Sequence, residues 1–226
     1  MFYRFSSDVE RQQQPATSDT GLFFFRGRPG APFAVIAPGG GFAYVASVHE
    51  GLPHAEGINS KGYNAFVLRY RVGQGGTVAT QDLAAAVSHI LVNAASLGVS
   101  PSGYSVWGSS AGARMAAAIG SHGVAAYGGV NAPRPSAVVM AYTGHSDYAS
   151  VEPPTFVVVG AEDGIAPPAA MTRRVEALCR TGTQVEYREY KGLGHGFGLG
   201  IGTAAEGWIF EAIRFWETSM SSRPGK

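Results

Sequence analysis

The chain has a single cysteine, Cys179, among its 226 residues. A lone cysteine excludes an intramolecular disulfide and any metal site built from several thiolates. Its helix-like surroundings predict a half-buried thiol with a packing role. No apolar run approaches the ~18 residues of a transmembrane helix, and no signal-peptide core follows the first residues. We therefore expect a cytoplasmic protein without a membrane partner.

Charge is also sparse. Charged residues make up 15% of the chain and the formal net charge is +1. Nucleic acids and anionic membrane surfaces attract clustered basic residues, and no such cluster is present, so no nucleic-acid partner is expected. Internal repeats, low-complexity tracts and linkers are absent as well. We expect one domain over residues 1–226, in which residues 1–20 form an N-terminal strand and loop region.

Apolar residues and glycine are abundant, at 45% and 32 residues. Continuous apolar runs predict strands buried on both faces; they lie at 22–25, 33–37, 64–70, 104–107, 137–142 and 155–159. An alternating run predicts an edge strand at 185–190. Helical spacing predicts helices at 81–97, 113–119, 169–180 and 204–219, and is weak at 50–61. Strands that alternate with helices indicate the α/β class, with a doubly wound, mostly parallel sheet flanked by helices.

The pentapeptide Gly-Ser-Ser-Ala-Gly at 108–112 joins an apolar strand to a helix-like stretch. This is the context of a nucleophile elbow. A sharp turn there strains the backbone of the middle residue, and the flanking glycines avoid collisions. The Oγ atom of Ser110 would stand clear of the sheet, beside the positive end of the helix. The alternative is a helix of small residues that Ser110 merely caps.

Two further polar residues follow predicted strands: Asp163 after 155–159 and His195, in a glycine-rich loop, after 185–190. A serine hydroxyl needs a base to take its proton, and a carboxylate orients the imidazole that does so. The order serine, acid, histidine is the one that α/β-hydrolases use. We therefore predict a catalytic triad of Ser110, Asp163 and His195. Glu162 and Asp147 remain alternatives for the acid, Asp163 could instead cap the next helix, and His195 could be structural.

Three consecutive glycines, residues 39–41, follow the strand at 33–37. A tetrahedral oxyanion needs N–H donors, which this loop and Ala111 could supply. The alternative is a flexible turn, since a phosphate loop would need a lysine that is absent. Side chains of the same strand-end loops could line a substrate pocket, with packing as the equal alternative for each. These are Phe42, Tyr44, Tyr142, His145, Ile165 and Phe197.

Together these motifs resemble the α/β-hydrolase superfamily over roughly residues 33–215. The loop at 38–42, the segment Lys-Gly-Tyr-Asn at 61–64 and Gly-His-Gly-Phe at 194–197 carry the resemblance. The chain is most similar to small serine esterases of the acetyl-esterase and feruloyl-esterase-like group. The resemblance implies no cofactor and no metal, and a short-chain acyl ester of a small molecule or carbohydrate as substrate. It also implies the site roles, with Ser110 as nucleophile, Asp163 as acid, His195 as base, and Gly40, Gly41 and Ala111 as oxyanion donors.

Two positions depart from that group's pattern. Pro38 stands where a histidine usually opens the glycine loop, so the loop's outer hydrogen bonds are in question. Ala113 stands where a second glycine often follows the elbow, which should matter little. The connection at 143–154 is too short for a helical lid, so an open site with a preference for acetyl to butyryl esters is expected.

Other functions remain open at this stage. A peptidase or an acyltransferase could use the same triad, because the fold does not choose among them. A catalytically silent, hydrolase-like binding module is the alternative from another class. The sequence is also compatible with a homodimer.

Overall fold

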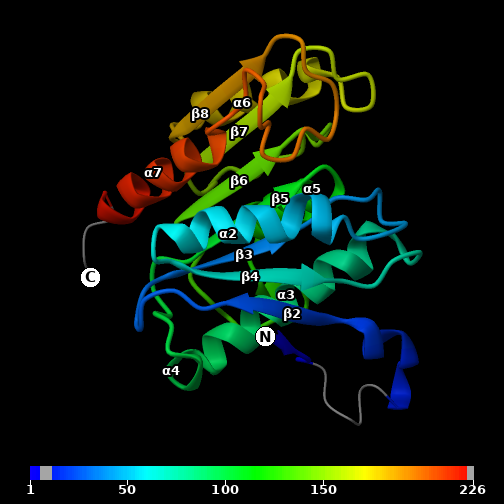
Figure 1. Ribbon diagram of the computed structural model, residues 1–226, viewed down its shortest axis with the longest axis vertical. Coiled ribbons are helices and arrows are strands. Elements are labelled where there is room, and N and C mark those ends of the chain that lie inside the picture. The colour runs from blue at the N-terminus through cyan, green and yellow to red at the C-terminus, as the bar shows by residue number, and fades with distance from the viewer. Residues whose placement is uncertain (6–11, 223–226) are drawn as a thin grey trace.

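The computed structural model describes residues 1–5 and 12–222, which fold around one eight-stranded sheet with the strand order β1-β2-β4-β3-β5-β6-β7-β8 (Figure 1). β1 (Phe2–Tyr3) and β2 (Gly21–Phe25) run antiparallel to their neighbours. The other six strands are parallel. They are β3 (Phe33–Ala37), β4 (Asn64–Arg69), β5 (Ser105–Ser109), β6 (Ala137–Ala141), β7 (Thr155–Gly160) and β8 (Val185–Tyr190).

Helices cover both faces of the sheet (Figure 1). α2 (Leu52–Ser60) and α7 (Trp208–Ser221) pack on one face, where Trp107, Trp208 and Trp216 are buried. The other face carries α3 (Gly75–Val92), α5 (Ala111–His122) and α6 (Pro168–Arg180). Because the central strands are covered on both sides, their apolar runs are continuous. The predicted fold class is therefore confirmed.

Short elements complete the chain: η1 (Pro15–Asp19), η2 (Ser47–Gly51), α4 (Ala94–Leu97) and η3 (Ala125–Tyr127). The expected N-terminal region contains β1 and η1, while its residues 6–11 lie outside the described part of the chain. No helix of the described residues is long and apolar enough to cross a membrane.

Two helix predictions are corrected by the structure. The weakly periodic stretch at 50–61 contains the end of the π-helix η2 and all of α2, whose periodicity Gly51 and Pro53 obscure. The helix expected at 81–97 begins at Gly75 and is interrupted at Asn93. Cys179 is also exposed rather than half-buried, because it lies on the outer side of α6 while Leu178 points to the core.

The parallel strands end at the same edge of the sheet, and their carboxyl ends carry the loops that the sequence singled out. The glycine loop follows β3, Ser110 follows β5, Asp163 follows β7 and His195 follows β8. In open α/β sheets the crevice at this edge is the usual ligand site. The fold thus gathers residues that lie up to 156 positions apart, from Gly39 to His195, at one edge.

Candidate active site

The elbow between β5 and α5 holds Ser110 in a strained conformation, with φ 50° and ψ −115°. Its flanking glycines are required by close packing. A Cβ on Gly112 would lie 1.9 Å from the carbonyl oxygen of Ala37, and a Cβ on Gly108 would lie 2.2 Å from the carbonyl oxygen of Gly112. The Ser110 N–H donates to the carbonyl of Ala141, 2.8 Å away. The turn is thus fixed by β3 on one side and β6 on the other, which leaves the hydroxyl free to face outward.

His195 bridges the other two predicted triad residues. Its Nε2 lies 2.9 Å from Ser110 Oγ, and its Nδ1 lies 2.7 Å from Asp163 Oδ2. Asp163 is buried, and its second oxygen accepts hydrogen bonds from the N–H groups of Ile165 and Ala166 at 2.9 and 2.7 Å. One carboxylate therefore both orders its own turn and contacts the imidazole. Asp163 does not cap α6, because the residues that it holds precede the helix and the N-cap position is Pro167.

The alternative acids lie elsewhere. Glu162 is exposed and accepts a hydrogen bond from the Gly192 N–H at 3.0 Å. Asp147 is exposed and accepts from the N–H of Tyr148, also at 3.0 Å. Neither carboxylate contacts His195 within the described residues.

The glycine loop places free donors beside the serine. Gly40 and Gly41 have positive φ values of 121° and 62°, and both line a cleft with Ser110 and His195. Across the described chain, no acceptor takes a hydrogen bond from the N–H groups of Gly40, Gly41 or Ala111. Their role as oxyanion donors stays a prediction. The N–H of Gly39 is not available, because Glu50 Oε2 accepts from it at 2.6 Å.

A tyrosine supplies hydrogen bonds to the loop that begins with Pro38. The Tyr70 hydroxyl donates to the carbonyl oxygens of Pro38 and Gly39, at 2.9 and 3.1 Å. Burial raises the pKa of Tyr70 well above its ordinary value, and the nearby Glu50 adds to this. The hydroxyl is therefore a permanent donor. Tyr70 and Glu50 together anchor the loop from two sides, although no histidine opens it.

The cleft has a volume of about 680 Å³ and an apolar rim. Tyr44 and Ile165, both expected in the pocket, line it and are 64% and 77% exposed. Val48 on the same rim is 80% exposed. The connection from β6 to β7 carries no helix, so no helical lid from this connection covers the cleft.

The other four expected pocket residues lie elsewhere. Phe42 and His145 line a neighbouring hollow of about 400 Å³. Tyr142, which has a positive φ of 37°, is fully buried and does not line the cleft. It packs edge-to-face against His195 at 5.3 Å and against Phe197 at 4.7 Å between ring centroids. Tyr142 therefore supports the histidine and Phe197 supports Tyr142, and neither lines the cleft.

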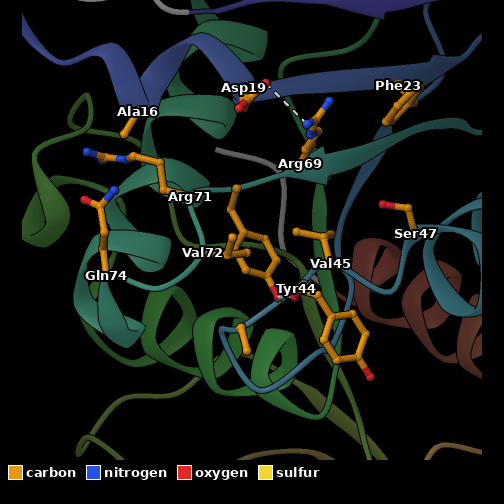
Figure 2. A pocket seen from close by; sticks show the side chains of 12 residues that line it. Ala16, Asp19, Phe23, Tyr44, Val45, Ser47, Arg69, Arg71, Val72 and Gln74 are labelled. Atoms are coloured by element: carbon orange, nitrogen blue, oxygen red, sulfur yellow. Dashed lines mark hydrogen bonds and ion pairs between the residues drawn. The ribbon is translucent and has the colours of Figure 1, made fainter.

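A further hollow, of about 560 Å³, adjoins the cleft and shares Tyr44, Val45 and Ser47 with it (Figure 2). Figure 2 shows the Arg69–Asp19 ion pair across this hollow, with an N–O distance of 3.3 Å. Both side chains are largely exposed. The hollow extends the open surface on the side of Tyr44 away from Ser110.

Two residues that flank the site, His49 and Glu50, had no role in the sequence-based predictions. The His49 Nε2 lies 2.9 Å from the carbonyl oxygen of Gly196 in the histidine loop. Burial raises the pKa of Glu50, while the Gly39 N–H, the Tyr142 hydroxyl and nearby His49 oppose this rise. Both residues belong to η2, whose weak periodicity gave no signal. No group of three or more metal-ligating side chains occurs among residues 1–5 and 12–222.

No protein-family model and no curated protein matches this chain in sequence. Solved structures do match it. An acetyl ester-xyloside bifunctional hydrolase from Caldicellulosiruptor lactoaceticus aligns with a TM-score of 0.84 and 22% identity, over 96% of each chain. The α/β hydrolase MGS-M1, from a Medee basin deep-sea metagenome library, has a TM-score of 0.80 and 25% identity, over 98% of this chain and 97% of its own. The carboxylesterase Cest-2923 from Lactobacillus plantarum WCFS1 has a TM-score of 0.76 and 20% identity, over 92% and 94%. The chain therefore has the α/β-hydrolase fold.

Proposed function

We propose that this α/β-hydrolase-fold chain is a serine carboxylesterase that hydrolyses short-chain acyl esters through an acyl-enzyme. The observation that carries the proposal is the pair of contacts made by His195, 2.9 Å to Ser110 Oγ and 2.7 Å to Asp163 Oδ2. These contacts open on a cleft that also contains Gly40 and Gly41. Nucleophile, base, acid and donors thus meet at one point, which is the arrangement that acyl transfer needs.

In the first step, Ser110 Oγ attacks the ester carbonyl while its proton passes to His195 Nε2. Asp163 keeps the imidazole in the tautomer with hydrogen on Nδ1 and stabilises the imidazolium that forms. The carbonyl oxygen becomes an oxyanion, to which the N–H groups of Gly40, Gly41 and Ala111 donate. His195 then gives its proton to the departing alcohol, and the acyl group stays on Ser110.

In the second step, His195 takes a proton from water, and the resulting hydroxide attacks the acyl carbonyl. The same donors stabilise the second oxyanion. Collapse of this intermediate returns the proton to Ser110 Oγ and releases the carboxylic acid. Each proton therefore passes through His195, and no other group of the chain is needed to balance the reaction.

The shape of the site supports a small acyl group and a large alcohol. Each methylene that a wall buries contributes about 0.8 kcal/mol, and an open cleft with a discontinuous rim offers a long chain little such burial. The hollow beyond Tyr44 offers room for a bulky leaving group such as a sugar. Two of the structural neighbours, named as an acetyl ester-xyloside hydrolase and a carboxylesterase, fit this class of substrate.

The test is kcat/KM for p-nitrophenyl acetate, butyrate, octanoate and palmitate, measured beside acetylated sugars and a peptide amide. We expect the acetate and butyrate to be the best p-nitrophenyl substrates and the sugar acetates to be hydrolysed. Activity that rises through octanoate to palmitate would contradict the short-chain preference. A peptide cleaved faster than the esters would favour a peptidase. Failure of a fluorophosphonate to label Ser110 would favour a silent binding module.

A further inference from the structure

Glu50 is a buried carboxyl group without a cationic partner. Its side chain lies in η2, the residue is 5% exposed, and none of the ion pairs among the described residues includes it. A buried carboxylate that lacks a cation costs stability. Its presence beside the predicted triad therefore points to a role in the site itself.

The segment that contains Glu50 holds Gly39 by both of its backbone groups. Glu50 Oε2 accepts from the Gly39 N–H at 2.6 Å, and the Ala46 N–H donates to the Gly39 carbonyl at 3.0 Å. Tyr70 donates to the same carbonyl at 3.1 Å. Since a hydrogen bond to a charged acceptor is about twice as strong as a neutral one, the Glu50 bond is the strongest of the three. It fixes the plane of the Pro38–Gly39 peptide. The bonds from Ala46 and Tyr70 to the Gly39 carbonyl hold the next peptide, which carries the Gly40 N–H.

Gly39 lies directly against the predicted nucleophile. A Cβ on Gly39 would be 3.0 Å from Ser110 Cβ, 3.0 Å from the Ser109 carbonyl oxygen and 2.9 Å from Glu50 Oε2. The glycine is therefore packed between the elbow and the glutamate. A shift of the Glu50 carboxyl would move the loop relative to Ser110, and oxyanion donors need placement within a fraction of an ångström.

The same segment also reaches the histidine side of the site. His49, the neighbour of Glu50, contacts the Gly196 carbonyl at 2.9 Å. The segment thus contacts the glycine loop through Glu50 and the histidine loop through His49.

We propose that Glu50 is the positioning residue of the oxyanion loop: its carboxylate holds the Gly39 peptide against the elbow and so aims the Gly40 and Gly41 N–H groups at the reacting carbonyl. This role rests on the proposed esterase function and adds a residue to it. Glu50 itself touches neither the substrate nor the transferred proton. It acts through the backbone of the loop.

Three variants test the role with p-nitrophenyl acetate. Glu50→Ala removes the acceptor and should lower kcat about 100-fold with KM within about threefold, because the donors act mainly in the transition state. Glu50→Gln keeps an oxygen that accepts from Gly39 and should stay within about tenfold of wild type. Glu56→Gln, an exposed site on α2, is the matched control and should behave as wild type.

Two readouts separate positioning from mere stability. The first is the Ki of a trifluoromethyl ketone, whose serine adduct carries an oxyanion; it should rise in Glu50→Ala by the factor that kcat/KM falls. The second is the pH dependence of kcat. Groups that face Glu50 are Tyr142, Tyr70, His49 and His195. Glutamine does not titrate, so the acid limb of Glu50→Gln should lose one ionisation and become less steep than that of wild type.

The outcomes distinguish the two proposals. If wild type neither hydrolyses the ester nor binds the ketone, both the function and the role of Glu50 are overturned. If wild type is active and Glu50→Ala matches it, only the role of Glu50 is overturned. The role also fails if Glu50→Gln loses as much activity as Glu50→Ala, or if urea unfolding shows that the lost activity follows the lost folded fraction. The positioning role of Glu50 is supported if Glu50→Gln has a less steep acid limb of kcat and Glu50→Ala binds the ketone more weakly than wild type.

Discussion

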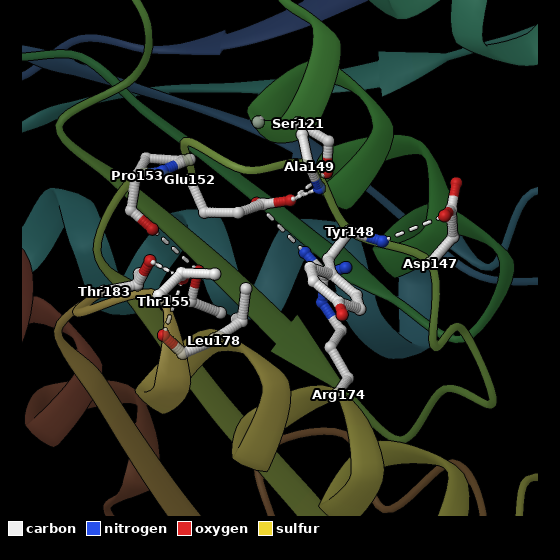
Figure 3. Close-up of polar contacts among 12 residues, drawn as sticks. Ser121, Asp147, Tyr148, Ala149, Glu152, Pro153, Thr155, Arg174, Leu178 and Thr183 are labelled. Atoms are coloured by element: carbon white, nitrogen blue, oxygen red, sulfur yellow. Dashed lines mark hydrogen bonds and ion pairs between the residues drawn. The ribbon is translucent and has the colours of Figure 1, made fainter.

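Two glutamates with buried side chains, Glu50 and Glu152, differ in whether a cation pairs with them. Glu50 lies against the oxyanion loop without a cation. Glu152, just before β7, forms an ion pair with the fully buried Arg174 at 3.2 Å and accepts from Ser121 Oγ at 2.5 Å and from the Ala149 N–H at 2.7 Å (Figure 3). Glu152 thus ties the 143–154 connection to α5 and α6.

The two glutamates mark two regions of the molecule: Glu50 lies at the edge of the sheet that carries the candidate active site, and Glu152 lies in a region with a structural role. A paired carboxylate with several donors contributes to folding, and removal of one partner leaves the other charge buried alone. An unpaired carboxyl beside a nucleophile contributes to the geometry of a site at some cost in stability. Substitutions at the carboxyl edge of the sheet should therefore change activity more than stability, and substitutions at Glu152 should do the reverse.

The largest effect is expected from Ser110→Ala. Loss of the nucleophile should lower kcat/KM by roughly 10⁴- to 10⁶-fold. The free energy of unfolding should change by no more than about 1 kcal/mol, because the hydroxyl faces the cleft and its loss leaves no cavity. Ester kinetics and urea unfolding of the same preparation check both parts. Wild-type turnover in this variant would transfer the nucleophile role to another residue such as Ser109, and parallel loss of stability and activity would make Ser110 structural.

The other triad residues should follow in order. His195→Ala should cost nearly as much as Ser110→Ala, because the residues act as a unit. Asp163→Asn should cost less, roughly 10⁴-fold in kcat, because an amide favours the wrong imidazole tautomer. Glu162→Gln is the matched control, since glutamine can still accept from Gly192. If Asp163→Asn kept the wild-type kcat while Glu162→Gln or Asp147→Asn lost most of it, the role of the triad acid would pass to Glu162 or Asp147.

Glu152→Ala tests the other side of the comparison. It leaves Arg174 buried without its partner and should lower the free energy of unfolding by about 3–5 kcal/mol. For a chain of this size that corresponds to a fall in Tm of roughly 10 °C. The kcat of the molecules that remain folded should be unchanged, because the hydrogen-bond partners of Glu152 in the described part of the chain are Ser121, Ala149 and Arg174, outside the candidate site. Glu56→Ala, at an exposed position, serves as control. A stable but inactive Glu152→Ala would refute the separation of the two regions.

The features of the fold and of the candidate site that could be predicted from the sequence share a local origin. Continuous apolar runs predicted the central strands, because burial on both faces leaves no alternation. Each predicted triad residue lies in the loop that follows a predicted parallel strand, and parallel strands end at one edge, so their proximity follows from the topology. The elbow could be predicted for the same reason: a side chain at Gly108 or Gly112 would collide with the backbone of adjacent elements.

The residues that were missed depend on contacts between distant segments. Tyr70 reaches the glycine loop 31 and 32 residues away, and nothing around Glu50 or Glu152 in the sequence distinguishes a buried glutamate from a solvated one. Tyr142, which has a backbone φ of 37°, is buried, contrary to the expectation that a strand-end aromatic faces the ligand. Such features follow from the packed fold rather than from any pattern of residues.

The smallest effect is expected at a third buried group, His54, which is neither paired like Glu152 nor linked to the nucleophile like Glu50. Burial lowers the pKa of His54 from 6.5 to about 4, and its ring packs edge-to-face on Trp208 at 5.2 Å. Between those two pKa values the unfolded chain binds more protons than the folded one. The contribution that the buried, neutral His54 makes to the free energy of unfolding is therefore complete above pH 6.5 and is lost as the pH falls towards 4.

The shift from 6.5 to about 4 corresponds to roughly 3 kcal/mol. His54→Phe keeps an aromatic ring against Trp208 and cannot be protonated. Its free energy of unfolding should therefore fall less than that of wild type when urea titrations are moved from pH 7 to pH 4.5. A slope will remain, since burial also lowers the pKa of the half-buried His145 to about 4. His122→Phe, at an exposed position, should retain the wild-type pH dependence. Equal pH dependence in wild type and His54→Phe would contradict this prediction. It would mean that the imidazole of His54 is hydrated in solution and that burial does not lower its pKa.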